Sequence, residues 1–215
     1  MLFKDIQATI EIDLKKSIDE LWNMVDKDGR WGVNKARKEN LVISFPANSD
    51  EEMKFYEIYR QTIIGNRLIP KDYLELKKDM NKLFLCKKDG KIIAGAAIKI
   101  QDNKTVLFLN ASEPEFLKYQ PNNLLYWSVV KWSKENGFSI FDLGGYQLNA
   151  EKGSKLHEIN KFKLRWGGEI KKYYVYDENP FYIIARKVIR NFPRIKKIRE
   201  EIKFKTWKKR YGFEK

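Results

Sequence analysis

The fold of this 215-residue chain rests on two short segments, FDLGG at residues 141–145 and FKLRWGG at residues 162–168. FDLGG closes an apolar run from Phe138 that is typical of a β-strand. Its two glycines permit backbone geometry closed to other residues, with N–H groups free to face a ligand. FKLRWGG lies at the end of a helix expected near residues 154–165, and a strand over residues 169–176 follows it. The two segments therefore predict a strand–helix–strand unit.

The apolar pattern upstream of this unit predicts three antiparallel strands and a helix. Residues 82–86 and 91–98 flank Asp89-Gly90, a dipeptide that strongly favours a tight hairpin turn. Residues 105–109 supply the third strand. A helix is expected over residues 121–135, which begin with a proline suited to the first turn. This order is that of a sheet built as a meander before the chain crosses over.

The N-terminal third contains both strand and helix signals. Ser17 and Glu20 form a capping box, which predicts a helix through about Asp26. Further strands and helices are expected at residues 9–14, 30–38, 41–45, from 50 onward, and 71–80. The whole pattern predicts an α+β fold with a mixed, mainly antiparallel sheet flanked by helices. We expect one domain over residues 1–179.

The final segment, residues 180–215, carries most of the net charge of +14. It holds 13 Lys and Arg against 3 Asp and Glu, whereas the rest of the chain holds 30 against 26. Ile195, Ile198 and Ile202 form an apolar stripe at helical spacing, which predicts a basic helical extension packed on the domain through that stripe. A solvated helix face, or contact with nucleic acid or an anionic membrane surface, is also consistent with this composition.

The composition disfavours membrane-spanning, secreted and metal-binding proteins. The longest apolar runs are too short to span a bilayer, and the N-terminus lacks the apolar core of a signal peptide. Cys86 is the one cysteine and has apolar neighbours, so we expect a buried thiol and neither a disulfide nor a Cys-based metal site. The sequence has no Ser/His/Asp arrangement, metal-ligand spacing or P-loop. We therefore expect a cytoplasmic protein with no metal.

Several motifs in a fixed order resemble the FemABX family. They are NNLLYW at residues 122–127, ENGF at 135–138, FDLGG at 141–145, and FK at 162–163 followed by WGG at 166–168. FemABX proteins are aminoacyl-tRNA-dependent transferases that build peptidoglycan cross-bridges, within the wider GNAT acyltransferase superfamily. The resemblance covers nearly the whole chain and implies a GNAT-like acyltransferase fold. It covers only one of the family's two GNAT-like domains, so the identity of the acceptor is not carried over.

Lys163 is the residue that the resemblance implies for catalysis. It lies in the expected helix between apolar Phe162 and Leu164, one turn before Gly167. A lysine held there can stabilise the oxyanion that forms when an amine attacks an ester or thioester carbonyl. No general base is required of the protein, because the amine of the substrate is itself the nucleophile and positioning does much of the work.

The expected substrate-binding residues surround Lys163 in the sequence or lie on an upstream helix. Gly144, Gly145 and Tyr146 are expected to line a cleft, with Trp166 packed beneath it. Asp142 either caps the turn that follows it or faces a ligand. Arg67 is a candidate for binding a phosphate. The full set is Asp142, Gly144, Gly145, Tyr146, Trp166 and Arg67.

The segment from Ala111 to Pro121 bears on the acyl donor. GNAT enzymes that use CoA hold its pyrophosphate with a glycine-rich loop between a strand and a helix. This segment contains no glycine and two glutamates, which would repel a pyrophosphate. It therefore favours aminoacyl-tRNA as the donor substrate, with no resident cofactor, and leaves acyl-CoA or an acyl carrier protein as the alternative.

These observations lead to one main hypothesis and two others. The main one is transfer of an activated acyl group from aminoacyl-tRNA to an amine of a cell-wall precursor or related glycan. The basic tail would then contact tRNA or the inner face of an anionic membrane. The alternatives are an N-acyltransferase of a sugar or small molecule and a non-catalytic RNA- or membrane-binding module. Either the acceptor differs from that of the family, or a second subunit, as in a homodimer, completes the cleft.

Overall fold

The computed structural model describes residues 3–177, 179–191 and 193–210. The strands in this part of the chain are β1 (Phe3–Asp13), β2 (Val42–Ser44), β3 (Lys82–Lys88), β4 (Lys91–Gln101), β5 (Lys104–Ser112), β6 (Ile140–Gly145) and β7 (Glu169–Asp177). The helices are α1 (Ile18–Met24), α2 (Lys27–Lys38), α3 (Ser49–Gly65), α4 (Tyr73–Asp79), the 3₁₀ helix η1 (Pro114–Tyr119), α5 (Pro121–Glu135), α6 (Lys155–Leu164), α7 (Pro180–Asn191) and α8 (Pro193–Arg210).

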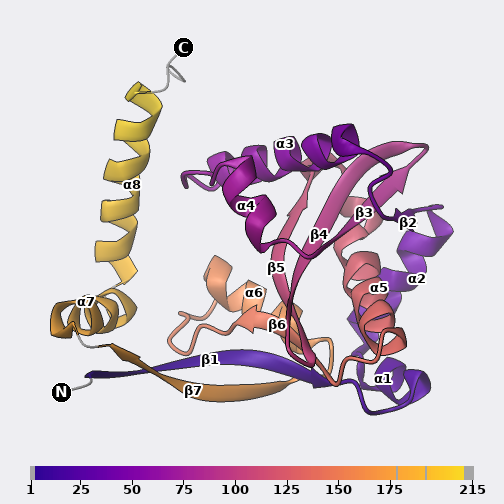
Figure 1. The fold of residues 1–215 in the computed structure, drawn as a ribbon, viewed down its shortest axis with the longest axis horizontal. Helices are drawn as coiled ribbons and strands as arrows, with labels where there is room; N and C mark the ends of the chain where they lie inside the picture. The colour runs from indigo at the N-terminus through magenta and orange to yellow at the C-terminus, as the bar shows by residue number, and fades with distance from the viewer. Residues whose placement is uncertain (1–2, 178, 192, 211–215) are drawn as a thin grey trace.

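All seven strands form one sheet in the order β2-β3-β4-β5-β6-β1-β7. Only the β5–β6 pair is parallel, so the prediction of a mixed, mainly antiparallel sheet is confirmed. The N-terminal strand β1 lies between β6 and β7 (Figure 1). Both of these neighbours come from the C-terminal half of the chain. Local patterns identified this strand, but its neighbours are set by long-range pairing that such patterns do not encode.

The parallel pair β5–β6 is short. Residues 104–106 pair with residues 140–142, and the two strands then part. Beyond this point β5 continues beside β4, while the end of β6 pairs with β1, where Gly145 lies opposite Thr9. Figure 1 shows the two strands diverging. Within the described residues, β5 from Leu107 onward has no strand partner on the side that faces β6.

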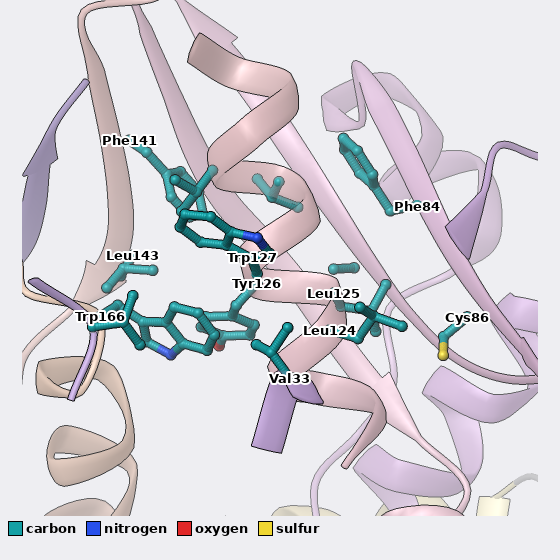
Figure 2. Close-up of a cluster of buried hydrophobic side chains, with 14 of the residues drawn as sticks. Val33, Phe84, Cys86, Leu124, Leu125, Tyr126, Trp127, Phe141, Leu143 and Trp166 are labelled. Atoms are coloured by element: carbon teal, nitrogen blue, oxygen red, sulfur yellow. The ribbon is translucent and has the colours of Figure 1, made fainter. Parts of the chain in front are cut away.

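Two apolar layers cover the two faces of the sheet. Strand β3 shows how the alternation works, because Phe84 and Cys86 face one layer while Leu83 and Leu85 face the other. The larger layer contains α1, α2 and α5 and is shown in Figure 2. The smaller layer lies under α3 and α4. Cys86 is fully buried, as expected, and burial raises the pKa of its thiol to about 12.

Local signals that depend on a few adjacent residues gave accurate predictions. Ser17 and Glu20 form the reciprocal capping box at the start of α1. Asp89 and Gly90 both have positive φ, 49° and 78°, as a two-residue hairpin turn requires. The glycine-free segment 111–120 contains the 3₁₀ helix η1, which begins at Pro114, a residue suited to the first position of a helix.

The C-terminal extension is helical, but the predicted stripe does not dock it. Ile198 and Ile202 on α8 are 58% and 60% exposed, so that expectation is wrong for both, and the side chain of Ile195 lies outside the described residues. On α7, Ile183 is buried and Arg186 pairs with the buried Asp5 of β1 at 3.4 Å. On α8, Phe204 is buried and Glu201 pairs with Arg67 at 3.6 Å.

Candidate active site

Lys163 lies where β6 parts from β5. It is in the last turn of α6, and its Nζ donates a hydrogen bond of 3.0 Å to the Gly145 carbonyl oxygen. A Cβ added to Gly144 would lie 3.8 Å from this Nζ and 3.3 Å from the Leu107 carbonyl oxygen of β5. The amine, the end of β6 and the unpaired side of β5 therefore lie together where the two strands part, a place that we call the β5–β6 slot. It comprises Leu107 to Ser112, Gly144, Gly145 and Lys163.

The side chain of Lys163 is partly buried. Burial lowers the pKa of Lys163 below its ordinary value, and the negative charge of Asp142 opposes that shift. A cation that is partly desolvated interacts more strongly with a developing negative charge than one in bulk water does. The arrangement can therefore stabilise an oxyanion that forms in the slot, at little cost in reorganisation.

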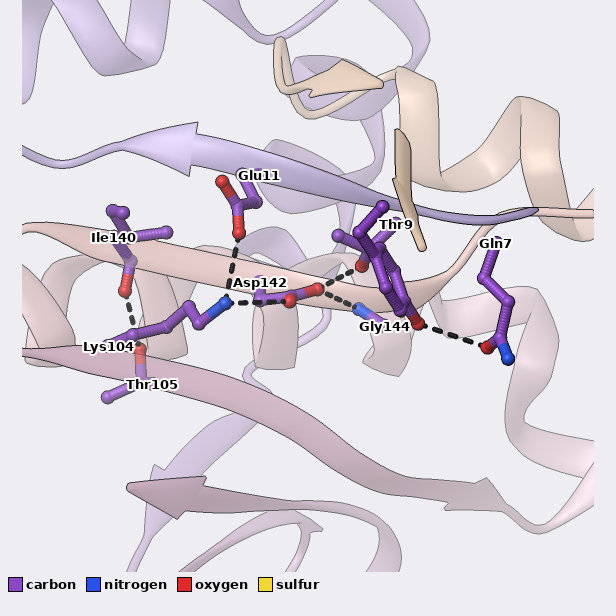
Figure 3. A network of polar contacts seen from close by, with 9 residues as sticks. Gln7, Thr9, Glu11, Lys104, Thr105, Ile140, Asp142 and Gly144 are labelled. Carbon is purple, nitrogen blue, oxygen red and sulfur yellow. Dashed lines mark hydrogen bonds and ion pairs between the residues drawn. The ribbon is translucent and has the colours of Figure 1, made fainter. Parts of the chain in front are cut away.

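Asp142 anchors the turn that carries the two glycines (Figure 3). Its Oδ1 accepts hydrogen bonds from the hydroxyl of Thr9 and from the Gly144 N–H, the latter at 2.7 Å, and its Oδ2 lies 3.4 Å from the Nζ of Lys104. Lys104 also pairs with Glu11 at 3.0 Å. Of the two roles considered for Asp142, capping the turn is the one that these contacts show, and substrate binding stays a prediction.

The other expected site residues occupy different environments. Tyr146 is partly buried, and its N–H donates to the Ala8 carbonyl at 2.7 Å, which holds the chain against β1. Trp166 is 2% exposed and packs on Tyr126, with ring centroids 5.5 Å apart, so its expected contact with substrate can only be indirect. Figure 2 shows this indole within the core.

Arg67 is not near Lys163. Its side chain is 72% exposed and pairs with Glu201 of α8 at 3.6 Å. The preceding residue, Asn66, contacts Lys155 at the opposite end of α6 from Lys163. A phosphate-binding role for Arg67 therefore stays a prediction about a group remote from the slot.

Two residues that shape the site, Thr9 and Lys104, carried no usable sequence signal. Thr9 and Lys104 are separated from Asp142 by 133 and 38 residues, so only the folded sheet brings them together. At the far end of β5, the side-chain oxygen of Asn122 accepts from Asn110 at 3.1 Å and from Ser112 at 2.6 Å. Asn122 thereby ties the first turn of α5 to the free end of β5.

The glycine-free segment before α5 is held against the β3–β4 hairpin. Lys91 pairs with Glu113 at 2.6 Å and with Glu115 at 3.4 Å. The Glu113 N–H also donates to the Ile93 carbonyl at 2.9 Å.

Within the described ranges, no three His, Cys, Asp or Glu side chains come together as a possible metal site.

The sequence is similar to known acetyltransferase domains and to bacterial glycyltransferases. A family model described as "Acetyltransferase (GNAT) domain" matches residues 71–153. The Lipid II:glycine glycyltransferase of Staphylococcus epidermidis is 27% identical over 133 residues, which are 60% of this chain and 31% of that protein. The same enzyme of Staphylococcus aureus is 28% identical over 93 residues, 43% of this chain and 22% of that protein.

Two solved structures have the same fold as this chain. The crystal structure of FemX superposes with a TM-score of 0.67 at 18% identity, over 82% of this chain and 63% of that one. The chain has a GNAT-like fold and is similar to FemX in structure and to the Lipid II:glycine glycyltransferases in sequence. The C-terminal domain of a putative lysylphosphatidylglycerol synthetase from Agrobacterium fabrum has the same fold, with a TM-score of 0.65 at 15% identity, over 87% of this chain and 66% of that one.

The chain spans about a third of the length of the curated S. epidermidis relative that it matches. The matched family model covers the end of the α3–α4 connection through the turn after β6. It therefore includes Asp142, Gly144 and Gly145 but stops before Lys163. The position of Lys163 in the slot comes from the structure alone.

Proposed function

We propose that this chain is an acyltransferase that moves an aminoacyl group from tRNA to an amine of a lipid-linked cell-wall precursor. The observation that carries the proposal is the partly desolvated Lys163 amine at the parting of β5 and β6. Support for the type of acceptor comes from the relatives, which are named as glycyltransferases that act on Lipid II.

The chemistry follows from the slot. The aminoacyl ester enters between β5 and β6, and the acceptor amine attacks its carbonyl carbon. As the C–N bond forms, the carbonyl oxygen becomes an oxyanion, to which the Lys163 ammonium donates a hydrogen bond. Collapse of this intermediate breaks the C–O bond to the ribose, and the ribose oxygen takes the proton that the amine releases. The protein supplies orientation and electrostatic stabilisation, which suffice because the amine is a competent nucleophile.

We assign aminoacyl-tRNA as the donor on two grounds. One is the acidic segment 111–121, and the other is the surface of α2. Trp31 is 56% exposed, and the helical spacing puts Lys27, Lys35 and Lys38 on the same face. The Nζ of Lys35 lies 5.1 Å from the indole ring. An exposed aromatic ring among cations is the arrangement on which proteins stack unpaired bases.

The N-terminal end of α2 is next to the C-terminal end of α6, the helix that carries Lys163. The first turn of α2 contacts the residue that follows α6, because the Asp26 N–H donates to the Arg165 carbonyl at 2.8 Å. Arg165 also pairs with Asp28 at 3.2 Å. Trp31 lies one turn further along α2, where the single-stranded 3′ end of a tRNA can pass on its way to the slot.

Trp31→Ala is expected to weaken tRNA binding by about 5- to 150-fold, since stacking one base contributes about 1–3 kcal/mol. Trp31→Phe, which keeps an aromatic face, should retain most of the affinity. Fluorescence anisotropy with labelled tRNA measures both. Leu74→Ala, at an exposed position on α4, is the matched control and should change nothing. Equal tRNA affinity of Trp31→Ala and the wild type would assign the RNA contact to another surface.

The test of the proposed function is a transfer assay with paired donors and acceptors. Glycyl-tRNA and glycyl- or acetyl-CoA are offered as donors, with Lipid II and a simple amino sugar as acceptors. We expect a product only from charged tRNA with Lipid II. Transfer from a CoA ester, together with stabilisation of the protein by that ester in a thermal-shift assay, would favour the alternative N-acyltransferase. No transfer from any donor would favour a non-catalytic module.

A further inference from the structure

Helix α7 presents an apolar face to solvent. Phe181, Ile184 and Val188 are 78%, 52% and 37% exposed, and their spacing of three and four residues puts them on one side of the helix. The opposite side holds the buried Ile183, and Arg186 pairs with Asp5 of β1. The helix is therefore anchored through one face and leaves the other uncovered. Exposed apolar clusters of this kind mark sites of interaction.

Helix α8 adds positive charge beside this face. It contacts α7 and rises from it beyond the end of the β1–β7 ribbon (Figure 1). Its described side chains include the exposed Arg199, Lys203 and Lys205, and the exposed Ile198 and Ile202 lie among them. Over residues 180–215 the basic residues outnumber the acidic ones by 13 to 3. An apolar surface bordered by this much positive charge is complementary to an anionic one.

We propose that α7 and α8 dock this protein on the surface of an anionic phospholipid bilayer. Phe181, Ile184 and Val188 enter the boundary between headgroups and acyl chains, while the lysines and arginines of α8 contact lipid phosphates. Amphipathic helices with aromatic and aliphatic residues beside a basic segment bind membranes in this way. No helix in the described part of the chain combines the length and hydrophobicity needed to cross a bilayer, so the contact is peripheral.

A bilayer fits this surface better than RNA does. RNA is bound through cations and through rings on which bases stack, and the aliphatic side chains of Ile184 and Val188 contribute to neither. The exposed Trp31 with its lysines lies on α2, in a different part of the fold, and serves the RNA assignment independently. The docking proposal does not depend on transferase activity, although it would bring the slot to a lipid-linked acceptor.

The test is co-sedimentation of the full chain with vesicles of phosphatidylcholine alone or mixed with phosphatidylglycerol. We expect binding only to the phosphatidylglycerol vesicles, weakened by salt. The variant Phe181→Ser/Ile184→Ser/Val188→Ser should lose binding by about tenfold or more, because its apolar anchors are removed. The matched control, Val42→Ser/Leu74→Ser, removes two side chains that are 58% and 69% exposed elsewhere and should bind as the wild type does.

Thermal unfolding checks that both variants fold, since every altered side chain is exposed. Absence of binding to phosphatidylglycerol vesicles at low salt would overturn the proposal, as would equal binding by the triple variant and the wild type. If the triple variant binds tRNA more weakly than the wild type but binds vesicles equally well, this face of α7 contacts RNA instead. The triple variant is expected to turn over a water-soluble analogue of Lipid II at the wild-type rate and to turn over Lipid II in vesicles more slowly. Loss of turnover with both acceptors would contradict a docking role.

Discussion

Replacing Lys163 with methionine is expected to lower the rate of transfer by about 100- to 1,000-fold, the loss typical of removing one oxyanion donor. Methionine fills a similar volume but supplies neither the charge nor the hydrogen bond to the Gly145 carbonyl oxygen. The matched control is Lys161→Met, in the same turn of α6, whose exposed side chain pairs only with Glu158 at 3.5 Å among the described residues. Lys161→Met should leave the rate of transfer unchanged. Single-turnover kinetics with charged tRNA separate this loss from weaker binding.

The same substitution is expected not to destabilise the fold. Burial lowers the pKa of Lys163 in the folded protein, so the unfolded chain binds this proton more tightly. The free energy of unfolding of the wild type therefore rises with pH between the lowered pKa and the ordinary lysine value, and the charged lysine is a cost below that window. Lys163→Met should remove that rise. Urea titrations at several pH values measure it. Retained transfer, or a fold lost at neutral pH, would contradict the assigned role.

Gly167→Ala is expected to lower the free energy of unfolding by about 2–5 kcal/mol, because it combines backbone strain with overpacking. Gly167 has φ of +73°, and an added Cβ would lie 2.6 Å from the Met24 Cβ and 2.7 Å from its carbonyl oxygen. The turn between α6 and β7 rests against the end of α1 at this point. Its displacement would also move Lys163, four residues earlier, so the rate of transfer should fall together with stability.

Two other glycines provide matched controls for the two causes. Gly137 has φ of +81° with nothing within 4 Å of an added Cβ, so Gly137→Ala reports the backbone strain alone. Gly65 has neither positive φ nor a close neighbour, so Gly65→Ala should cost little. Urea unfolding is expected to rank the losses as Gly167 above Gly137 above Gly65. A loss at Gly167 no greater than that at Gly137 would show that the contact with Met24 is relaxed at no cost.

The candidate site was only partly readable from the chain. Lys163 and the FDLGG glycines were identified from motifs and do lie together at the slot. Trp166 belongs to the same motif, yet it is a core residue, because the WGG turn folds inward against β1. Arg67 was predicted from its charge alone, and charge does not determine where in the fold a side chain lies.

Local patterns in the sequence determined most of the helices and strands of this protein. The Asp89-Gly90 hairpin, the Ser17–Glu20 capping box and the alternation of β3 each depend on residues within one turn or one strand, so their structures follow from local energetics. Only the tertiary structure placed β1 between β6 and β7 and left α8 with an exposed apolar stripe. It also built the Thr9–Asp142–Lys104 network and parted β5 from β6. These features arise from pairings between residues far apart in the chain, whose partners are selected by the packing of the whole domain rather than by any local propensity.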